Sequence, residues 1–145
     1  MPVMKFSVSG KCENPTKLVV NAGKFKIVID EPPNLGGTDQ GPNPVEYVLA
    51  ALGGCINVVG HLVAKEMGIE LKGLEMTIEG DLDPSKFMGK PTNERTGYKE
   101  IRVNLKPVTN ADNATLEKWI KAVEERCPVS DNLRNPTPVK INISK

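Results

Sequence analysis

Apolar residues along this chain follow two periodicities, which together predict the order of its secondary-structure elements. Two segments, residues 44–67 and 110–126, have the spacing or the uninterrupted apolar character of helices. Alternation of apolar and polar side chains, which is typical of strands, occurs at residues 4–9, 17–21, 24–30, 71–83, 99–108 and 139–143. The predicted order is therefore β-β-β-α-β-β-α-β, an α+β fold with largely antiparallel sheets.

The longest apolar segment lies between Asn43 and Gly68 and carries the signals of a complete helix. Asn43 suits the N-cap, Pro44 the first helical position and Glu46 the third position of a capping box, while Gly68 suits the C-terminal stop. A helix that is apolar nearly all round is typically buried, so we predict that it is the central helix of the fold. Its interruption by Gly, Asn and His, and the charges close to its ends, argue against a membrane span.

Length and composition narrow the class of protein. A chain of 145 residues predicts a single domain, residues 1–145. The net charge of +1 gives no sign of a nucleic-acid or membrane-surface binder. The N-terminus lacks a basic region followed by an apolar run, so we expect no signal peptide and a cytoplasmic location, where cysteines stay reduced.

The three cysteines, Cys12, Cys55 and Cys127, form neither a disulfide framework nor a CxxC metal motif. With His61 as the only histidine, no zinc site and no bound cofactor are expected. Cys12 falls in a predicted turn and is interpreted as an incidental thiol. His61 follows Cys55 by six positions, which places the two side chains on different faces of the helix, so it is interpreted as a hydrogen-bonded interface histidine.

Cys55 lies in the middle of the predicted central helix, directly after Gly53 and Gly54. Two glycines inside a helix cost roughly 1 kcal/mol each relative to alanine, which suggests that another backbone or a ligand approaches closely there. The alternative is that Cys55 is a small buried hydrophobic residue.

Cys127 ends the second predicted helix and precedes Pro128. Proline cannot easily continue that helix, but it suits the first position of a new one, residues 128–133, with Cys127 as the N-cap. A cysteine at a helix N-terminus has its thiolate stabilised by the helix dipole.

Three motifs in the same order resemble the OsmC/Ohr family of thiol-dependent peroxidases and their relatives, over most of the chain. The first runs from Asn43-Pro44 to Gly53-Gly54-Cys55, and the second is Cys127-Pro128-Val129 followed by Leu133. The third is the strand–loop–strand from Gly80 to Ile101. The resemblance implies an intertwined homodimer around two central helices, with two equivalent sites at the subunit interface.

The resemblance also implies that Cys55 is the peroxidatic cysteine and that Cys127 resolves it. A thiolate attacks the peroxide, the resulting sulfenic acid condenses with the second thiol, and an external dithiol reduces the disulfide. The apolar setting of Cys55 suits an organic hydroperoxide, whose alkyl or acyl tail would lie beside the sulfur.

The chain departs from the peroxidase pattern in its charges. The resemblance implies an activating arginine from the N-terminal strands, oriented by a glutamate near the start of the central helix. The first arginine here is Arg95, and Val45 holds the expected glutamate position. Glu46, one residue later, is a candidate catalytic residue and equally a capping residue. Other sources of the charge are Arg95, Arg126 and Arg134.

Three functional hypotheses follow from the sequence. The first is a thiol peroxidase acting on organic hydroperoxides through Cys55 and Cys127. The second is a non-catalytic OsmC-like protein that binds a small apolar or thiol-reactive ligand at the dimer interface. The third is a structural dimer in which both thiols are simply buried.

Overall fold

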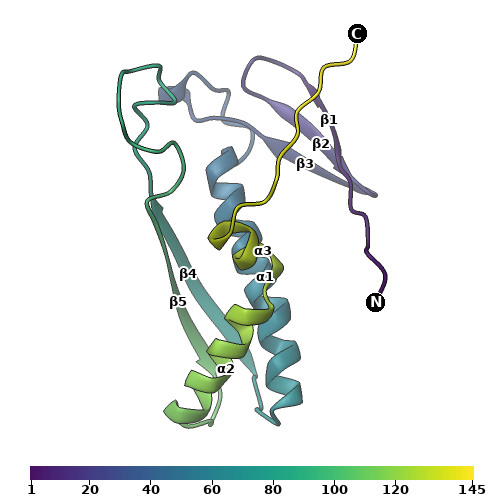
Figure 1. The fold of residues 1–145 in the computed structure, drawn as a ribbon, viewed down its shortest axis with the longest axis vertical. Coiled ribbons are helices and arrows are strands. Elements are labelled where there is room, and N and C mark those ends of the chain that lie inside the picture. Colours follow the sequence, from purple (N-terminus) through teal and green to yellow (C-terminus); the bar gives the residue numbers. More distant parts are fainter. The chain divides into compact units, whose positions relative to one another are not determined.

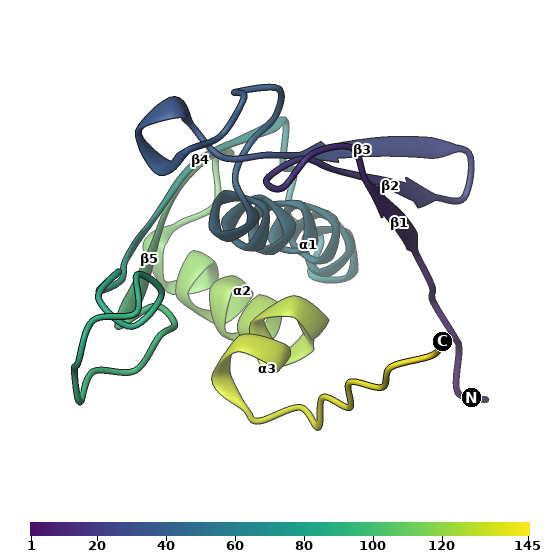
Figure 2. The ribbon, with the colours of Figure 1, turned by 90° about the horizontal axis from the view of Figure 1, so that it is seen from above.

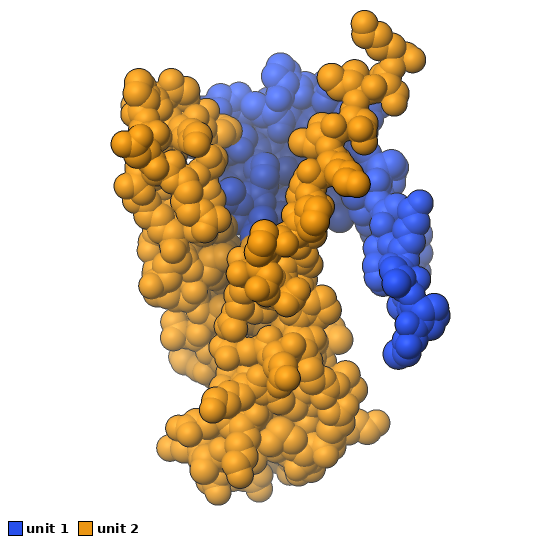
Figure 3. Space-filling view, viewed as in Figure 1, with its two compact units in different colours: residues 1–48 blue, residues 49–145 orange.

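The computed structural model describes residues 1–145, which form two compact units (Figure 3). The first unit is Met1–Val48 and the second is Leu49–Lys145. Helix α1, Pro44–Glu66, begins in the first unit and continues into the second.

The first unit contains a three-stranded antiparallel sheet in the order β1 (Ser9–Cys12), β2 (Leu18–Ala22), β3 (Phe25–Ile29) (Figure 1). The two strands predicted at residues 17–21 and 24–30 are confirmed as β2 and β3, which form a hairpin with Leu18 opposite Ile29 and Ala22 opposite Phe25. Gly23 occupies the turn with φ of 59°, a left-handed conformation that glycine adopts without steric cost.

The prediction of a first strand at residues 4–9 was wrong. The strand that pairs with β2 is Ser9–Cys12, so Cys12, which we expected in a turn, ends β1 opposite Leu18. Residues 1–8 pair with no strand of this chain, and their apolar side chains are exposed, with Phe6 at 83% and Val8 at 66%.

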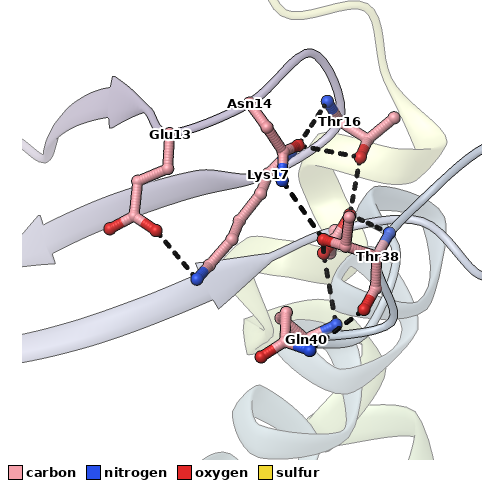
Figure 4. Close-up of polar contacts among 7 residues, drawn as sticks. Glu13, Asn14, Thr16, Lys17, Thr38 and Gln40 are labelled. Atoms are coloured by element: carbon pink, nitrogen blue, oxygen red, sulfur yellow. Dashed lines mark hydrogen bonds and ion pairs between the residues drawn. The ribbon is translucent and has the colours of Figure 1, made fainter.

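Asp30, directly after β3, is fully buried and accepts hydrogen bonds from several parts of the first unit. Thr16 Oγ1 donates to its carboxylate at 2.8 Å, Thr38 Oγ1 donates to the other oxygen, and the backbone N–H of Gln40 donates at 3.2 Å. Figure 4 shows how Asn14, Thr16, Thr38 and Gln40 gather there. The carboxylate therefore joins the β1–β2 turn to the loop that leads into α1.

These hydrogen bonds set the ionisation of Asp30. Burial opposes the charged form, but the bonds from Thr38, the Glu31 N–H, Thr16 and the Gln40 N–H outweigh it and hold the pKa of Asp30 well below its usual range. A carboxyl group with a depressed pKa stabilises the folded state at every pH above its unfolded-state value of about 3.9, and that stabilisation is lost as pH falls through the folded pKa.

The variant Asp30→Asn should therefore unfold at a lower temperature than the wild type at pH 7, because an amide presents a donor to groups that already donate. The difference between the two melting temperatures should shrink below about pH 4, where wild-type Asp30 begins to lose its advantage. Thermal unfolding followed by circular dichroism between pH 3 and pH 7 measures both. A difference that does not change with pH would contradict the assignment.

The start and end of α1 follow the sequence signals. The Glu46 N–H donates to Asn43 Oδ1 at 2.9 Å and the Asn43 N–H donates to Glu46 Oε2 at 2.9 Å, which is a complete capping box. Tyr47 in the first turn donates its hydroxyl to the Val28 carbonyl at 2.6 Å. Gly68 ends the helix with φ of 69°.

In the second unit, the hairpin of β4 (Gly73–Asp81) and β5 (Glu100–Val108) packs against α1 and against α2 (Asn113–Arg126) (Figures 1 and 2). The predicted strands and their alternation are confirmed, with Met76 opposite Leu105 and Ile78 opposite Val103. The predicted apolar stripe of α2 is also confirmed and joins α1 in one core, whose buried members are Leu52, Ile56, Val59, Val63, Ala64, Trp119, Val123 and Cys127.

Two glycines of α1 allow this packing. A Cβ at Gly53 would lie 2.7 Å from Ile78 on β4, and one at Gly60 would lie 3.1 Å from the indole of Trp119. Gly54, in contrast, has no atom of the chain within 4 Å of a Cβ position. The close approach predicted for the glycine pair therefore occurs at Gly53, where the neighbour is a strand of the same chain.

Helix α1 is less buried in the single chain than we predicted. One face packs into the core, but Val58 on the other face is 67% exposed and Leu62 is 48% exposed. The length and composition of α1 would allow it to cross a membrane, but a core helix can have the same properties, and α1 contributes five buried side chains to the core shared with α2.

The α2–α3 region confirms one prediction and corrects another. Helix α3, Pro128–Arg134, has Cys127 as its N-cap, as predicted. The N-cap of α2 is Asp112, whose carboxylate accepts from the Thr115 N–H at 2.7 Å and suits the positive end of the helix, so the helix begins at Asn113 and not at residue 110 as predicted.

The predicted last strand at residues 139–143 is absent, since this segment pairs with no strand of the chain. Its alternating apolar side chains are almost fully exposed, with Val139 at 80% and Ile141 and Ile143 at 89%.

Candidate functional site

The second unit brings Cys55 and Cys127 together, although they are far apart in the sequence. Cys55 lies on α1 and is partly exposed, while Cys127 lies at the junction of α2 and α3 and is 1% exposed. Cys55 packs against the core to which Cys127 belongs, and the two thiols are close enough for Cys127 to change the pKa of Cys55. Both are free thiols in this structure.

Two contacts between α1 and α2 fix the position of Cys127. The indole Nε1 of Trp119 donates to the Gly60 carbonyl at 2.8 Å inside the core. The guanidinium of Arg126 donates to both carboxylate oxygens of Glu66, which makes a bidentate pair. Because Arg126 directly precedes Cys127, this pair holds the end of α2 against the end of α1.

The first turn of α3 supplies a hydrogen-bond donor to each sulfur. The Ser130 N–H donates to Cys127 Sγ at 3.4 Å, and the Val129 N–H donates to the Cys55 sulfur. Pro128 at the first helical position fixes the backbone that presents these donors. Backbone N–H groups stabilise a thiolate because they place partial positive charge beside it.

Burial raises the pKa of the Cys55 thiol above its ordinary value, and the hydrogen bond that the Cys55 thiol donates to Cys127, together with the charge on Cys127, raises it further. The Val129 N–H lowers the pKa but does not offset the other two effects. Cys55 is therefore predominantly a neutral thiol at pH 7 in the single chain.

No arginine of this chain takes the place of the activating cation. None is among the groups that set the pKa of Cys55. Two of the alternatives suggested from the sequence are ion-paired, Arg126 with Glu66 and Arg134 with Glu124 at 3.2 Å. The charge that the peroxidase pattern implies is thus not provided by the residues that surround Cys55 in one chain.

Glu46 is an exposed residue whose carboxylate is engaged by the start of α1. It also lines a polar pocket of about 370 Å³ in the first unit, formed by the loop before α1; the lining residues are Pro32, Asp39, Gln40, Gly41, Pro42, Asn43 and Glu46. The capping role is confirmed, and the catalytic role of Glu46 stays a prediction.

Two further residues drew notice in the sequence, Cys12 and His61, and neither is among the groups that set the pKa of Cys55. Cys12 is exposed at the end of β1. His61 is exposed on α1, with Nδ1 at 2.9 Å from the Asn57 carbonyl oxygen, and it is not among the groups that affect Cys55. Sequence reasoning missed the Val129 N–H, because a backbone donor leaves no signal in residue identity.

Comparison with known proteins agrees with the motifs. The family model described as OsmC-like protein matches residues 37–142, which is most of the chain and includes both Cys55 and Cys127. The chain belongs to the OsmC-like family. Its α+β architecture, with antiparallel sheets and three α-helices, is the architecture of this family.

Relatives of this OsmC-like chain are similar over nearly their whole length. A protein of Mycoplasma pneumoniae named hydroperoxide reductase is 22% identical over 140 residues, which cover 97% of this chain and 94% of that protein. The crystal structure of an OsmC-like protein from the same organism has a TM-score of 0.79 at 22% identity, covering 97% of this chain and 95% of that one. An organic hydroperoxide resistance protein from Legionella pneumophila has a TM-score of 0.66 at 21% identity, covering 92% of each chain. At these identities the structures establish the fold alone.

Proposed function

We propose that this protein is a thiol-dependent peroxidase that reduces organic hydroperoxides, with Cys55 as the peroxidatic and Cys127 as the resolving cysteine. The observation that carries the proposal is the contact of these two thiols in the core of the second unit. The names of two relatives, hydroperoxide reductase and organic hydroperoxide resistance protein, support the same chemistry. A role in cytoplasmic defence against oxidative stress would follow.

In the first step the Cys55 thiolate attacks one oxygen of the hydroperoxide and the O–O bond breaks. The alkoxide leaves and takes a proton to become an alcohol, and Cys55 becomes a sulfenic acid. Cys55 suits this role because it is the more exposed of the two sulfurs. The apolar side chains around it favour a substrate with an organic tail.

In the second step the sulfur of Cys127 attacks the sulfur of the Cys55 sulfenic acid. A disulfide forms, and the hydroxide that leaves is released as water. Because Cys55 packs against the core that contains Cys127, the two cysteines lie on segments that already meet, and a disulfide requires their Cα atoms to come within about 4.4–6.8 Å. An external dithiol then restores both thiols, and no bound cofactor takes part.

The second candidate function is a non-catalytic protein that binds an apolar or thiol-reactive ligand. It is favoured by the lack of a free activating cation beside Cys55. The charges nearest the site in sequence, Arg126 and Arg134, are bound to Glu66 and Glu124, and Cys55 has a raised pKa. A neutral thiol in an apolar setting binds ligands without reducing peroxides.

We also propose a homodimer, in which a second copy covers the exposed apolar side chains. These occur on α1, in residues 1–8 and in residues 136–145, and include Val58, Leu62, Phe6, Ile141 and Ile143. Isolated apolar residues on a surface are common, but three separate stretches of alternating or helical pattern are typical of an interface. Light scattering should give twice the chain mass of 15.8 kDa. A mass equal to one chain would contradict the dimer.

The peroxidase proposal is tested by counting thiols in the reduced protein during titration with cumene hydroperoxide. We expect rapid loss of two thiols per chain at low peroxide excess, with Cys55 linked to Cys127 in the peptide map and Cys12 still free. Thiols that react only as slowly as free cysteine would show that the fold is present without peroxidase activity.

A further inference from the structure

We propose that the reduction of the oxidised pair has a fixed direction: the incoming thiol attacks the sulfur of Cys55, and the sulfur of Cys127 is released. The proposal rests on the proposed function only in that it takes the Cys55–Cys127 disulfide as the oxidised state. In thiol–disulfide exchange the thiolate attacks one sulfur and the other leaves, so access to each sulfur and the stability of the leaving thiolate decide the outcome.

The two cysteines differ in their exposure to solvent. Cys127 is 1% exposed and is a member of the core with Trp119 and Val123. Any assembly of chains leaves it as buried as this or more so, because association only removes surface from solvent. Cys55 is partly exposed, and it lies at the margin of the same core. An approaching thiolate therefore reaches Cys55 along the path that the hydroperoxide would use.

The stability of the thiolate that leaves favours the same direction of attack. Each sulfur has a backbone donor, the Ser130 N–H at 3.4 Å from Cys127 Sγ and the Val129 N–H at Cys55, so the donors alone do not distinguish the two sulfurs. Burial nevertheless raises the pKa of Cys55, which disfavours its release as the thiolate when Cys127 is attacked. Cys127 is also held by its neighbours, because the Arg126–Glu66 pair and the Trp119–Gly60 hydrogen bond fix the end of α2. The released thiolate therefore remains beside Cys55.

The exchange balances as follows. A reductant thiolate forms a new S–S bond with Cys55 while the Cys55–Cys127 bond breaks, and the electron pair of that bond leaves on Cys127, which then takes a proton. The second thiolate of a dithiol reductant then attacks the reductant sulfur, so Cys55 leaves as a thiolate. Two electrons have passed to the protein, and the dithiol has become a disulfide. A monothiol lacks this second thiol. Its mixed disulfide with Cys55 is instead attacked by the neighbouring Cys127, which releases the monothiol and forms the Cys55–Cys127 disulfide again.

The test uses the variant Cys12→Ser, which leaves only the two cysteines of the site. The pair is closed with diamide, a thiol oxidant that requires no peroxidase activity, and the link is checked by peptide mapping. Excess glutathione is then added for short times, the reaction is stopped with acid, and the peptides are analysed for the glutathione adduct. We expect about tenfold or more adduct on Cys55 relative to Cys127.

Adduct on Cys127, or in equal amounts on both cysteines, would overturn the proposal, as would failure of diamide to close the pair. The same exchange in 8 M urea is the matched control, since unfolding exposes both sulfurs and the preference should disappear. A preference that persisted in urea would also overturn it, because the cause would then be local sequence. If hydroperoxide leaves both thiols intact while the diamide-closed pair opens at Cys55, the peroxidase function fails and the directionality stands.

Discussion

The variant Cys55→Ser is expected to lose the consumption of organic hydroperoxides by roughly a thousandfold or more, to the background rate of the reductant alone. The hydroxyl of serine is not ionised at neutral pH and is a poor nucleophile toward peroxide oxygen, whereas a thiolate is a strong one. The assay follows cumene hydroperoxide loss in the presence of excess dithiothreitol. Full activity in this variant would exclude Cys55 as the attacking residue.

Two other cysteine variants are controls for this result. Cys12→Ser should keep wild-type activity, because Cys12 is exposed at the end of β1 and lies in the other unit. Cys127→Ser should retain the first chemical step, so Cys55 is oxidised by one equivalent of peroxide and then accumulates as a sulfenic acid that further peroxide oxidises irreversibly. If neither Cys55→Ser nor Cys127→Ser alters activity, both thiols are structural.

The variant Trp119→Ala should cause the largest loss of stability in the second unit, about 3–5 kcal/mol. Trp119 is 2% exposed, fills the space left by Gly60 and donates to its carbonyl at 2.8 Å. Its removal leaves a cavity and an unpaired buried acceptor between α1 and α2. We expect the melting temperature to fall by roughly 10–20 °C. A fall of only a few degrees would mean that this contact contributes little to the core.

The variant Trp119→Phe separates the two contributions. It keeps most of the apolar volume but loses the donor, so its melting temperature should lie between those of the wild type and Trp119→Ala. Because Trp119 helps to fix the end of α2, both variants should also slow formation of the Cys55–Cys127 disulfide relative to oxidation of Cys55. If each of the two steps has the same rate in the variants as in the wild type, Trp119 contributes to stability alone.

The sequence predicted those parts of the fold that depend on local signals. The capping box of Asn43 and Glu46, the stop at Gly68 and the stripe of α2 appear where they were expected, because each is set by neighbours within a few residues. The expected N-cap role of Cys127 is also confirmed, because a Cys-Pro pair after a helical segment leaves few alternatives.

Two predicted strands were wrong because their segments find no partner. Residues 4–8 and 139–143 alternate as well as any strand of the chain, but a strand forms only where a second one pairs with it, and neither segment pairs here. The contact between Cys55 and Cys127 could not be derived from local sequence patterns either, because it also depends on how distant segments pack. It depends on the register of α2 along α1, which Gly60 and Trp119 set across the core.

The two adjacent glycines before Cys55 are under different constraints during sequence evolution. A Cβ at Gly53 would lie 2.7 Å from the terminal methyl of Ile78 on β4, so a substitution there forces that side chain to shift and is selected against through the stability of the single chain. At Gly54 a Cβ meets no atom of the chain, and alanine would favour the helix by about 1 kcal/mol. If relatives keep glycine at position 54, the selection comes from a molecule outside this chain that contacts this face of α1. If some lineages have alanine there, those lineages have lost that contact.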